Sequence, residues 1–405
     1  MNKRLGLVLS AVMLVFWTSG IGLTGESARV QSTGSILRLI AEFEQGKFFR
    51  AGEVRVLVLT GNYRQMGRQY GALAKADLQA MHTTIGEVFL NNPDKKRRMT
   101  RDLLNTIARA VFDRYPQRYK EILHGMAETS GLGLDKILLV NALEWFPKIN
   151  RLSFGKCTGL AVWGPYTNGP VLFGRNDDDD PAYLPFALPT VAVFKPNDGS
   201  IPSALINYPG VIYNATGMNA DGLFMELNAG NEVGFSLDQT SIFTTLFLYL
   251  QEYRSLGDLD RAMRATLCNM GAIITVADPT RGYSYECSPS AMKRWDQDGE
   301  GIVAAANAFS HPDWNITPLD PKQDPGANQL RKGNLLKLSA KYKGMVTPEV
   351  MMKKIMDITV QDGGATHPGT IFQVVAAPAE RKIWLKVPGR VNWTEVALGP
   401  LFEIK

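Results

Sequence analysis

The stretch from Cys157 to Asp178 carries a thiol at its start and a guanidinium and a carboxylate at its end, three groups that can take part in one reaction. An apolar run follows Cys157, a turn is predicted at 167–170, and a second apolar run ends at Arg175, Asn176 and Asp178. This pattern predicts two strands joined as a hairpin, which brings the end of the second strand back beside Cys157. A thiol beside a guanidinium and a carboxylate can become a reactive thiolate, so Cys157 is a candidate nucleophile.

The sequence leaves the base for this thiol open. His82 and His124 are predicted to lie on helices without ligand partners, whereas His311 and His367 stay candidates for the base of a Cys–His hydrolase. No papain-like or caspase-like signature surrounds Cys157. The other candidate base is a free α-amino group at Cys157, because its reference pKa of about 7.7–8.0 is close to neutral pH.

The four adjacent aspartates at 177–180 predict a solvated turn with one inward-facing carboxylate rather than a metal site. Adjacent carboxylates cannot all face one ion, and calcium loops space their ligands differently. The sequence also lacks a phosphate-binding glycine loop, a G-x-S-x-G elbow and a metalloprotease helix. We therefore expect neither a metal nor a cofactor.

The elements that must position these residues change in character at Cys157. Before it, periodicity predicts a strand at 54–60 and helices at 35–45, 63–90, 101–115, 117–130 and 135–145. After it, strands are predicted at 158–164, 170–175, 189–195, 203–207, 211–216, 222–227, 271–277, 282–287, 302–306, 370–377 and 381–387. Helices at 241–254, 257–268, 327–340 and 347–358 lie among these strands. Strands grouped around paired helices predict an α+β, layered architecture.

Composition indicates a globular protein with a packed core. The chain has 405 residues, of which 45% are hydrophobic and 20% charged, enough for one large domain or two ordinary ones. The net charge of +5 is too small to indicate nucleic acid as a partner. The longest basic run, at 95–98, has no interleaved aromatic residues and is interpreted as a solvated helix start.

The N-terminus predicts export. Residues 1–23 carry Lys3 and Arg4, an apolar run and then small residues, which is typical of a secretory signal. An uncleaved membrane anchor is the alternative, and cleavage is favoured. We expect a periplasmic or extracellular protein. Cys268 and Cys287 flank a predicted hairpin, and two separately buried thiols are favoured there over a disulfide.

Several segments together resemble the N-terminal-nucleophile (Ntn) amidohydrolases that include isopenicillin-N acyltransferase and are related to choloylglycine hydrolases and penicillin V acylases. The resemblance covers roughly residues 50–390. It is carried by the glycine-containing helix start at 61–71, Cys157-Thr158, the G-R-N-x-D motif at 174–178, the G-M-N-x-x-G-L…L-N segment at 217–228, Ala306-Asn307 and Arg331.

The resemblance implies an αββα four-layer sandwich with a helical N-terminal segment, and a precursor that cuts itself between Lys156 and Cys157. Cys157 would attack a linear carboxamide and form a thioester, with its own α-amine as the base. The remaining roles implied are Arg175 and Asp178 holding the thiolate and α-ammonium, Asn228 and Asn307 stabilising the oxyanion, and Arg331 organising the network. Each oxyanion donor would contribute on the order of 3 kcal/mol.

One departure concerns the 156 residues before Cys157, since choloylglycine-type enzymes remove only a short leader. It favours the acyltransferase-like branch, in which this part stays bound as a second subunit. The expected division is a signal or anchor at 1–23, a linker and short helix at 24–50, a helical pro-segment at 51–156 and a catalytic domain at 157–405. The alternatives are a catalytically silent scaffold protein and a Cys–His hydrolase. The substrate, and whether the acyl group goes to water or to another acceptor, stay open.

Overall fold

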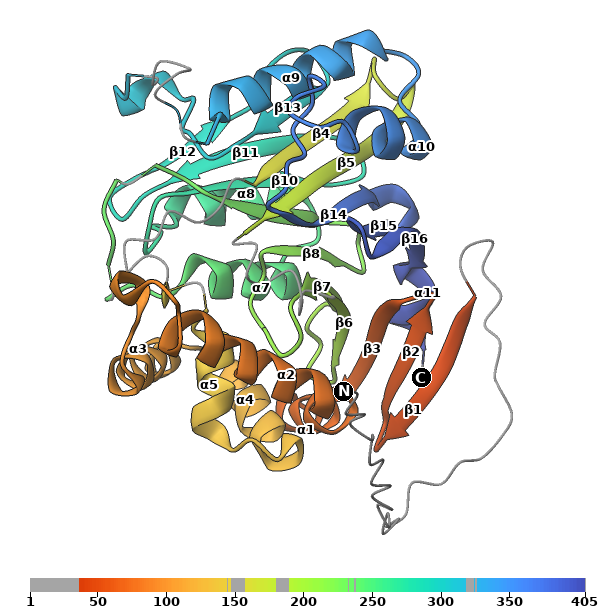
Figure 1. The fold of residues 1–405 in the computed structure, drawn as a ribbon. Coiled ribbons are helices and arrows are strands. Elements are labelled where there is room, and N and C mark those ends of the chain that lie inside the picture. The colour runs from red at the N-terminus through yellow and green to blue at the C-terminus, as the bar shows by residue number, and fades with distance from the viewer. Residues whose placement is uncertain are drawn as a thin grey trace, which may run out of the picture.

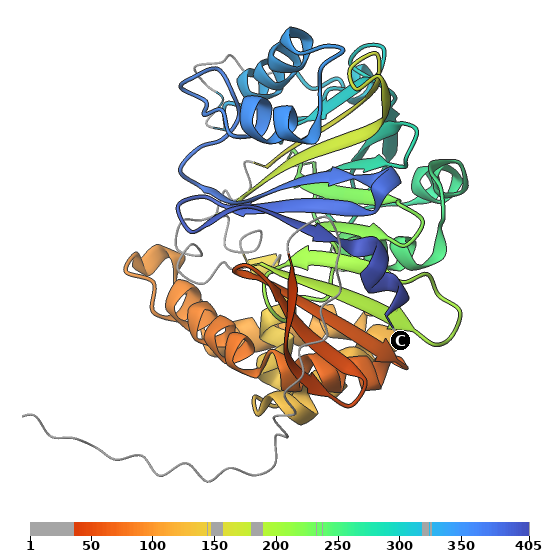
Figure 2. The same ribbon diagram turned by 90° about the vertical axis from the view of Figure 1, so that its right-hand side faces the viewer.

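The computed structural model describes residues 36–143, 145–146, 157–179, 189–231, 233–236, 238–317, 324 and 326–404. Within these residues two β-sheets lie face to face, and helices cover their outer faces (Figure 1). Figure 2 shows the same stack of layers from the side. The α+β, four-layer αββα sandwich expected from the sequence is confirmed.

The larger sheet has ten strands in the described part of the chain. Their spatial order is β1 (Leu37–Phe43), β2 (Gly46–Ala51), β3 (Val54–Gly61), β6 (Thr190–Pro196), β7 (Ser203–Asn207), β8 (Thr216–Asn219), β9 (Phe224–Ala229), β10 (Ala272–Ala277), β11 (Gly282–Cys287) and β12 (Met292–Trp295). All neighbours are antiparallel except β3 and β6, which pair in parallel. The segment before Cys157 therefore supplies three strands of this sheet as well as helices.

The smaller sheet has six strands within the same described residues. Their order is β13 (Ile302–Ala305), β4 (Thr158–Gly164), β5 (Gly169–Asp178), β14 (Thr370–Ala377), β15 (Lys382–Val387) and β16 (Val391–Ala397). Alternation along β5 sends Phe173 to the inner face, where its ring lies 4.7 Å from that of Phe224 in β9. Leu172 points the other way, into a cluster with Met351 and Leu335. The two faces of β5 thus reach different layers.

Helices form the two outer layers. Residues before Cys157 form α1 (Tyr63–Leu73), α2 (Lys75–Ile85), a π-helical turn at Gly86–Leu90, a 3₁₀ turn at Lys95–Arg97, α3 (Arg101–Asp113), α4 (Gln117–Ser130) and α5 (Leu134–Asn141). With α7 (Ile242–Glu252) and α8 (Leu256–Ala265), they cover the large sheet. On the small sheet lie α9 (Asn328–Lys341) and α10 (Pro348–Val350), which continues as a π-helical turn at Met351–Met356. The C-terminal α11 (Leu398–Glu403) contacts β15 and β6. No helix in the described residues is both long and apolar enough to cross a membrane.

The helix predicted over 35–45 is wrong, because residues 37–43 form β1 and residues 44–45 form the turn into β2. Leu37, Leu39, Ala41 and Phe43 share the more buried face of a strand, with exposed residues between them. Glu44 adopts a positive φ of 54° in the turn. The apolar positions 36, 37, 40 and 43 also fit a helical period, and pairing with β2 decides between the two structures.

Other differences from the sequence prediction are smaller. The strand predicted at 211–216 is irregular backbone up to residue 215, and β8 begins at Thr216. The strands β2, β12 and β16 and the helix α11 were not predicted. The remaining predicted strands and helices are present, with bounds that differ by a few residues.

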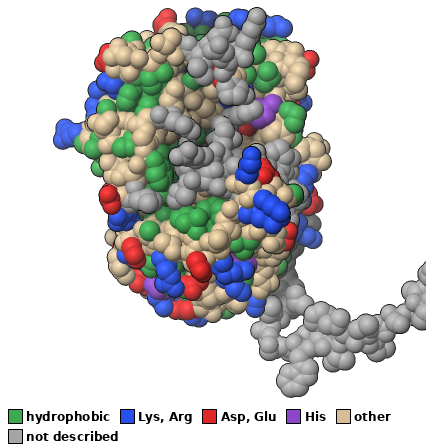
Figure 3. Space-filling model, turned by 60° about the vertical axis from the view of Figure 1, so that its left-hand side comes forward, with side chains coloured by type: hydrophobic (Ala, Val, Ile, Leu, Met, Phe, Trp, Pro, Cys, Tyr) green, Lys and Arg blue, Asp and Glu red, His purple; other side chains and the backbone are tan. Residues whose placement is uncertain are grey.

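Charged side chains at the lower end of the molecule are of mixed sign. In Figure 3 basic and acidic groups stand side by side there, at the end where α1 and α4 lie in Figure 1. Arg64 and Arg68 of α1 both pair with Glu128 of α4, and Arg64 also pairs with Glu121. These ion pairs between Arg64, Arg68, Glu121 and Glu128 join α1 to α4.

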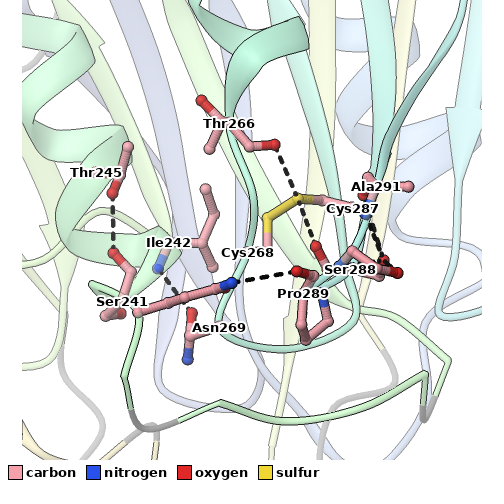
Figure 4. The surroundings of a disulfide bond; sticks show 12 residues. Ser241, Ile242, Thr245, Thr266, Cys268, Asn269, Cys287, Ser288, Pro289 and Ala291 are labelled. Atoms are coloured by element: carbon pink, nitrogen blue, oxygen red, sulfur yellow. Dashed lines mark hydrogen bonds between the residues drawn. A yellow bond between two sulfur atoms is a disulfide. The ribbon is translucent and has the colours of Figure 1, made fainter.

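Cys268 and Cys287 form a disulfide, so the favoured expectation of two separate thiols is wrong (Figure 4). Cys287 ends β11, and Cys268 lies in the segment that leads from α8 into β10. The Cys268 backbone N–H donates to the Ser288 carbonyl at 3.0 Å, and the Cα atoms of Cys268 and Cys287 come within 5.7 Å. That separation is within the range that a disulfide needs. The sequence pattern did not predict that these two cysteines lie close together.

Candidate active site

The β4–β5 hairpin brings Cys157 to the end of β5, as the sequence predicted. Thr158 lies opposite Asn176 in the register, so Cys157 comes opposite Asp177 and next to Asp178. The backbone N–H of Asp178 donates to Cys157 Sγ at 3.4 Å, and the thiol faces the Asp178 carbonyl oxygen at 3.6 Å. Nη2 of Arg175 lies 4.0 Å from the sulfur. Cys157 is buried and is the only free cysteine in the described part of the chain.

Burial in this environment disfavours a thiolate at Cys157 in the intact chain. Burial raises the pKa of the Cys157 thiol well above its ordinary value, and the Asp177 carboxylate raises it further. Arg175 acts in the opposite direction but does not outweigh these effects. The thiol is therefore neutral, and a base must remove its proton before it can attack.

Arg175 is held by carboxylates on the inner face of the hairpin. Alternation along β5 places Arg175 and Asp177 on the same side as Phe173, facing the large sheet. The guanidinium donates to Asp177 Oδ2 at 2.7 Å, to Glu226 and to Asn228 Oδ1 at 3.1 Å. Both Asp177 and Asp178 are buried, so the expected solvated turn with a single inward-facing carboxylate is wrong. Asp180 lies outside the described residues.

Glu226 is a site residue that the sequence analysis missed. It is fully buried in β9, where it contacts Arg175 and accepts from Asn228 Nδ2 at 3.2 Å. Burial raises its pKa to about 7, and Arg175 opposes the shift. The available signal was a lone acidic residue inside the apolar run at 222–227, two positions before Asn228 and thus on the same strand face.

Asp178 points away from the large sheet, towards α9. Its Oδ2 lies 3.4 Å from Arg331 Nη1 and 3.2 Å from His367 Nε2. Arg331 Nη1 also donates to the backbone carbonyl of Cys157 at 3.1 Å. The second oxygen of Asp178, Oδ1, is buried and has no hydrogen-bond partner among the described residues. One carboxylate oxygen beside the nucleophile thus retains its capacity to accept a donor.

Asn228 lies near the end of β9, and Asn307 contacts the last residue of that strand, Ala229. Arg175 Nη1 donates to Asn228 Oδ1, and Arg331 Nη2 donates to Asn307 Oδ1 at 3.0 Å. Because each arginine binds the amide oxygen, the NH₂ group of each asparagine is turned the other way. Asn228 Nδ2 donates to Glu226, and Asn307 Nδ2 donates to the Ala229 carbonyl at 2.7 Å. An NH₂ group has two hydrogens, so each amide keeps a second donor.

All six predicted site residues therefore lie in one connected group of polar contacts, in which Asn307 is partly buried and the other five are buried. Cys157 joins Arg175 and Asn228 on the inner side, and Asp178, Arg331 and Asn307 on the outer side. Their chemical roles stay predictions. Lys156, the other residue of the predicted cleavage bond, lies outside the described residues, as do residues 1–23.

The two candidate histidines differ in their distance from this group. His311 Nδ1 accepts from the Asp313 backbone N–H at 3.3 Å and caps a 3₁₀ turn at Pro312–Trp314. His367 Nδ1 accepts from the Gly369 N–H at 3.0 Å, which assigns the ring proton to Nε2, the nitrogen facing Asp178. His367 Nε2 thus lies 3.2 Å from Asp178 Oδ2 but forms no hydrogen bond among the described residues.

No protein-family model matches the chain, and no curated protein matches it. Among solved structures, a variant of the conjugated bile acid hydrolase from Clostridium perfringens is 13% identical with a TM-score of 0.40, over 61% of this chain and 94% of that chain. The N-acylethanolamine-hydrolyzing acid amidase ortholog of Caenorhabditis elegans is 16% identical with a TM-score of 0.42, over 55% and 93%. Penicillin V acylase from Agrobacterium tumefaciens is 10% identical with a TM-score of 0.42, over 60% and 86%. Likeness at this level carries no weight for activity, which has to be inferred from the contacts around Cys157.

Proposed function

We propose that this chain is a self-processing cysteine hydrolase of the N-terminal-nucleophile type, which cleaves linear carboxamides or transfers their acyl group. The observation that carries the proposal is the buried Cys157 thiol set between two arginine-centred groups of polar side chains. A neutral thiol needs a base close to it, and none of the hydrogen bonds that the sulfur forms among the described residues involves a histidine. The α-amine of Cys157 itself is the base that the proposal assigns.

Self-processing would supply that amine. The Cys157 thiol attacks the carbonyl carbon of Lys156, its proton passes to the departing Cys157 nitrogen, and the C–N bond breaks, so that the acyl group moves to sulfur and the nitrogen becomes a free amine. Water then hydrolyses the thioester and leaves Cys157 as the first residue of a new chain. The unpartnered Oδ1 of Asp178 supports this step, because it offers a buried acceptor for the new ammonium group.

The same groups would serve the reaction with substrate. The α-amine takes the thiol proton, and sulfur attacks the carboxamide carbon. The second N–H of Asn228 and that of Asn307 donate to the oxyanion, and each such donor contributes on the order of 3 kcal/mol. The α-ammonium then gives its proton to the leaving amine, and water or another acceptor releases the acyl group from the thioester. The chain's own residues perform every proton transfer.

Export is part of the proposal. The Cys268–Cys287 disulfide supports it, because disulfides persist in oxidising compartments and are rare in the cytosol. A periplasmic or extracellular enzyme fits the charged and apolar pattern of the first residues of the sequence, whether that segment is removed or kept as an anchor.

Intact-mass spectrometry on the denatured, purified protein tests the proposal. We expect two chains, one beginning at Cys157, for the unaltered protein and a single chain for Cys157→Ala. Cys157→Ser, which keeps a weaker nucleophile of similar size, should be processed more slowly. Incubation of the processed protein with phenylacetyl and lauroyl p-nitroanilides should add the acyl mass to the Cys157 chain alone.

A single uncut chain from the unaltered protein would remove the α-amine base and sink the proposal. Hydrolysis of the p-nitroanilides by that uncut chain would then favour the Cys–His hydrolase. The absence of both cleavage and acylation would favour the silent scaffold.

A further inference from the structure

Asp324 forms an unusually complete cap at the start of α9. One oxygen accepts from the Gly326 N–H at 3.1 Å and from Asn328 Nδ2 at 2.9 Å. The other accepts from the backbone N–H groups of Asn328 and of Gln329, the latter at 3.3 Å. Asp324 is buried. Capping the start of a helix requires only bonds from backbone N–H groups. The bond from the Asn328 side chain is therefore not explained by capping.

That bond fixes which way the Asn328 amide points. With its NH₂ group held by Asp324, the amide oxygen faces the opposite side. There it accepts from Arg331 Nη2 at 2.8 Å and from the Asn307 backbone N–H at 3.2 Å. A flipped amide would point its own N–H groups at these two donors, and both contacts would be lost.

Arg331 and Asn307 are thereby set in position on α9 and at the end of β13. Arg331 Nε donates to the Gly326 carbonyl at 2.9 Å, and Gly326 is itself bound to Asp324. Only with Nε and Nη2 fixed does Nη1 reach the Cys157 carbonyl and Asp178. Burial lowers the pKa of Arg331, and the Asp178 and Asp324 carboxylates oppose that shift by favouring the charged guanidinium.

We propose that Asp324 and Asn328 form a positioning pair that orients Arg331 and Asn307 for the chemistry at Cys157. The pair touches neither the nucleophile nor the carbonyl under attack. Asp324 fixes the orientation of the Asn328 amide. The amide oxygen then accepts from the Arg331 guanidinium and from the backbone N–H of Asn307. This inference rests on the proposed self-processing function and adds two residues to its machinery.

Asn328→Asp is the decisive variant. One oxygen of the new carboxylate can still accept from Arg331, but the other replaces the NH₂ group that donated to Asp324, so two carboxylates face each other. Two like charges in hydrogen-bond contact cannot both stay ionised in place. We expect self-processing to slow by between about tenfold and about a hundredfold at about pH 8. At about pH 5 the two carboxyl groups can share a proton that replaces the amide hydrogen, so the defect should shrink.

The swap Asp324→Asn/Asn328→Asp restores one amide facing one carboxylate. Because the new NH₂ group at position 324 then faces the Gly326 N–H, the swap should recover part of the rate at about pH 8. The matched control is Asn62→Asp, which introduces the same change at the exposed N-cap of α1, where the Asn62 oxygen accepts from the Gln65 N–H. It should process at the unaltered rate at both pH values. Rates are followed as loss of precursor mass after a pulse of cell-free synthesis of the full chain.

Far-UV circular dichroism and thermal unfolding establish that each variant is folded. A folded Asn328→Asp protein that processes like the unaltered chain at both pH values would overturn the positioning role while leaving the proposed function intact. So would a defect that is equal at both pH values and is not rescued by the swap, since that is the result of simple structural damage. An unaltered chain that never processes would instead refute the proposed function, and this inference with it.

Discussion

The guanidinium of Arg331 is bonded to the backbone carbonyl of Cys157 at 3.1 Å, although 174 residues separate them in sequence. The contact crosses from the helical layer to the small sheet, because Arg331 lies on α9 and Cys157 immediately precedes β4. It places a buried cation against the residue that we propose as nucleophile. The site therefore depends on how α9 packs on this sheet.

Replacing Arg331 should be costly for stability. Arg331→Met would leave the buried Asp178 carboxylate with only His367 beside it, and would remove the arginine donor from the oxygens of Cys157 and Asn307. We expect the free energy of unfolding to fall by about 3–5 kcal/mol. Urea unfolding should be measured in the Cys157→Ala background, in which the chain is expected to stay intact. Arg254→Met, which removes an exposed ion pair with Asp221, should cost less than about 1 kcal/mol. Equal losses in the two variants would contradict the assigned role.

Glu226 should make stability depend on pH. Its pKa is raised by burial to about 7 in the folded protein, against 4.5 when unfolded. Between these values the folded state holds a proton that the unfolded state has lost, so stability falls as pH rises through this window. The loss should reach about 3 kcal/mol above pH 7. In Glu226→Gln the decline between about pH 5 and about pH 8 should be smaller by that amount. The same pH slope in both proteins, measured by urea unfolding in the Cys157→Ala background, would refute this.

Gly159 makes room for Glu226. A Cβ atom at Gly159 would collide with Glu226 Oε1, whereas a Cβ atom at Gly169 on the same hairpin would meet open space. Gly159→Ala should displace the carboxylate from Arg175 and destabilise the protein by about 1–3 kcal/mol. Gly169→Ala has the same change in composition and should be neutral or slightly stabilising. Thermal unfolding of the two variants gives the comparison, and indistinguishable midpoints would count against the packing argument.

His367 should not be the catalytic base. In His367→Ala, self-processing and acylation by the p-nitroanilides should stay within about tenfold of the unaltered protein, because the imidazole contacts Asp178 and not the thiol. His311→Ala is the control, since His311 caps a 3₁₀ turn. A general base would instead contribute about 10²–10⁴ in rate. A drop of that size in folded, processed His367→Ala would revive the Cys–His hypothesis.

The hairpin at Cys157 could be predicted from the sequence because its two strands are local and separated by a recognisable turn. The contacts of the site could not. Glu226 meets Arg175 across 51 residues, through the packing of two sheets whose relative placement no local pattern encodes. The neutral state of the thiol follows from burial, which a sequence shows only indirectly. The helix predicted at 35–45 was wrong for a related reason. The apolar spacing there fits both a helix and a strand, and pairing with β2 determines that the segment is a strand.

The parallel pairing of β3 with β6 has a consequence for the cut protein. It joins β1, β2 and β3 to strands that follow Cys157, so one continuous sheet would be shared by the two products of cleavage. Refolding of the uncut chain is a first-order process. Once the peptide bond is broken, the same sheet can be rebuilt only by encounter of two molecules, at a rate that falls on dilution. Cleavage would thus convert a reversible fold into one whose recovery depends on concentration, and the active enzyme would owe its persistence to slow unfolding.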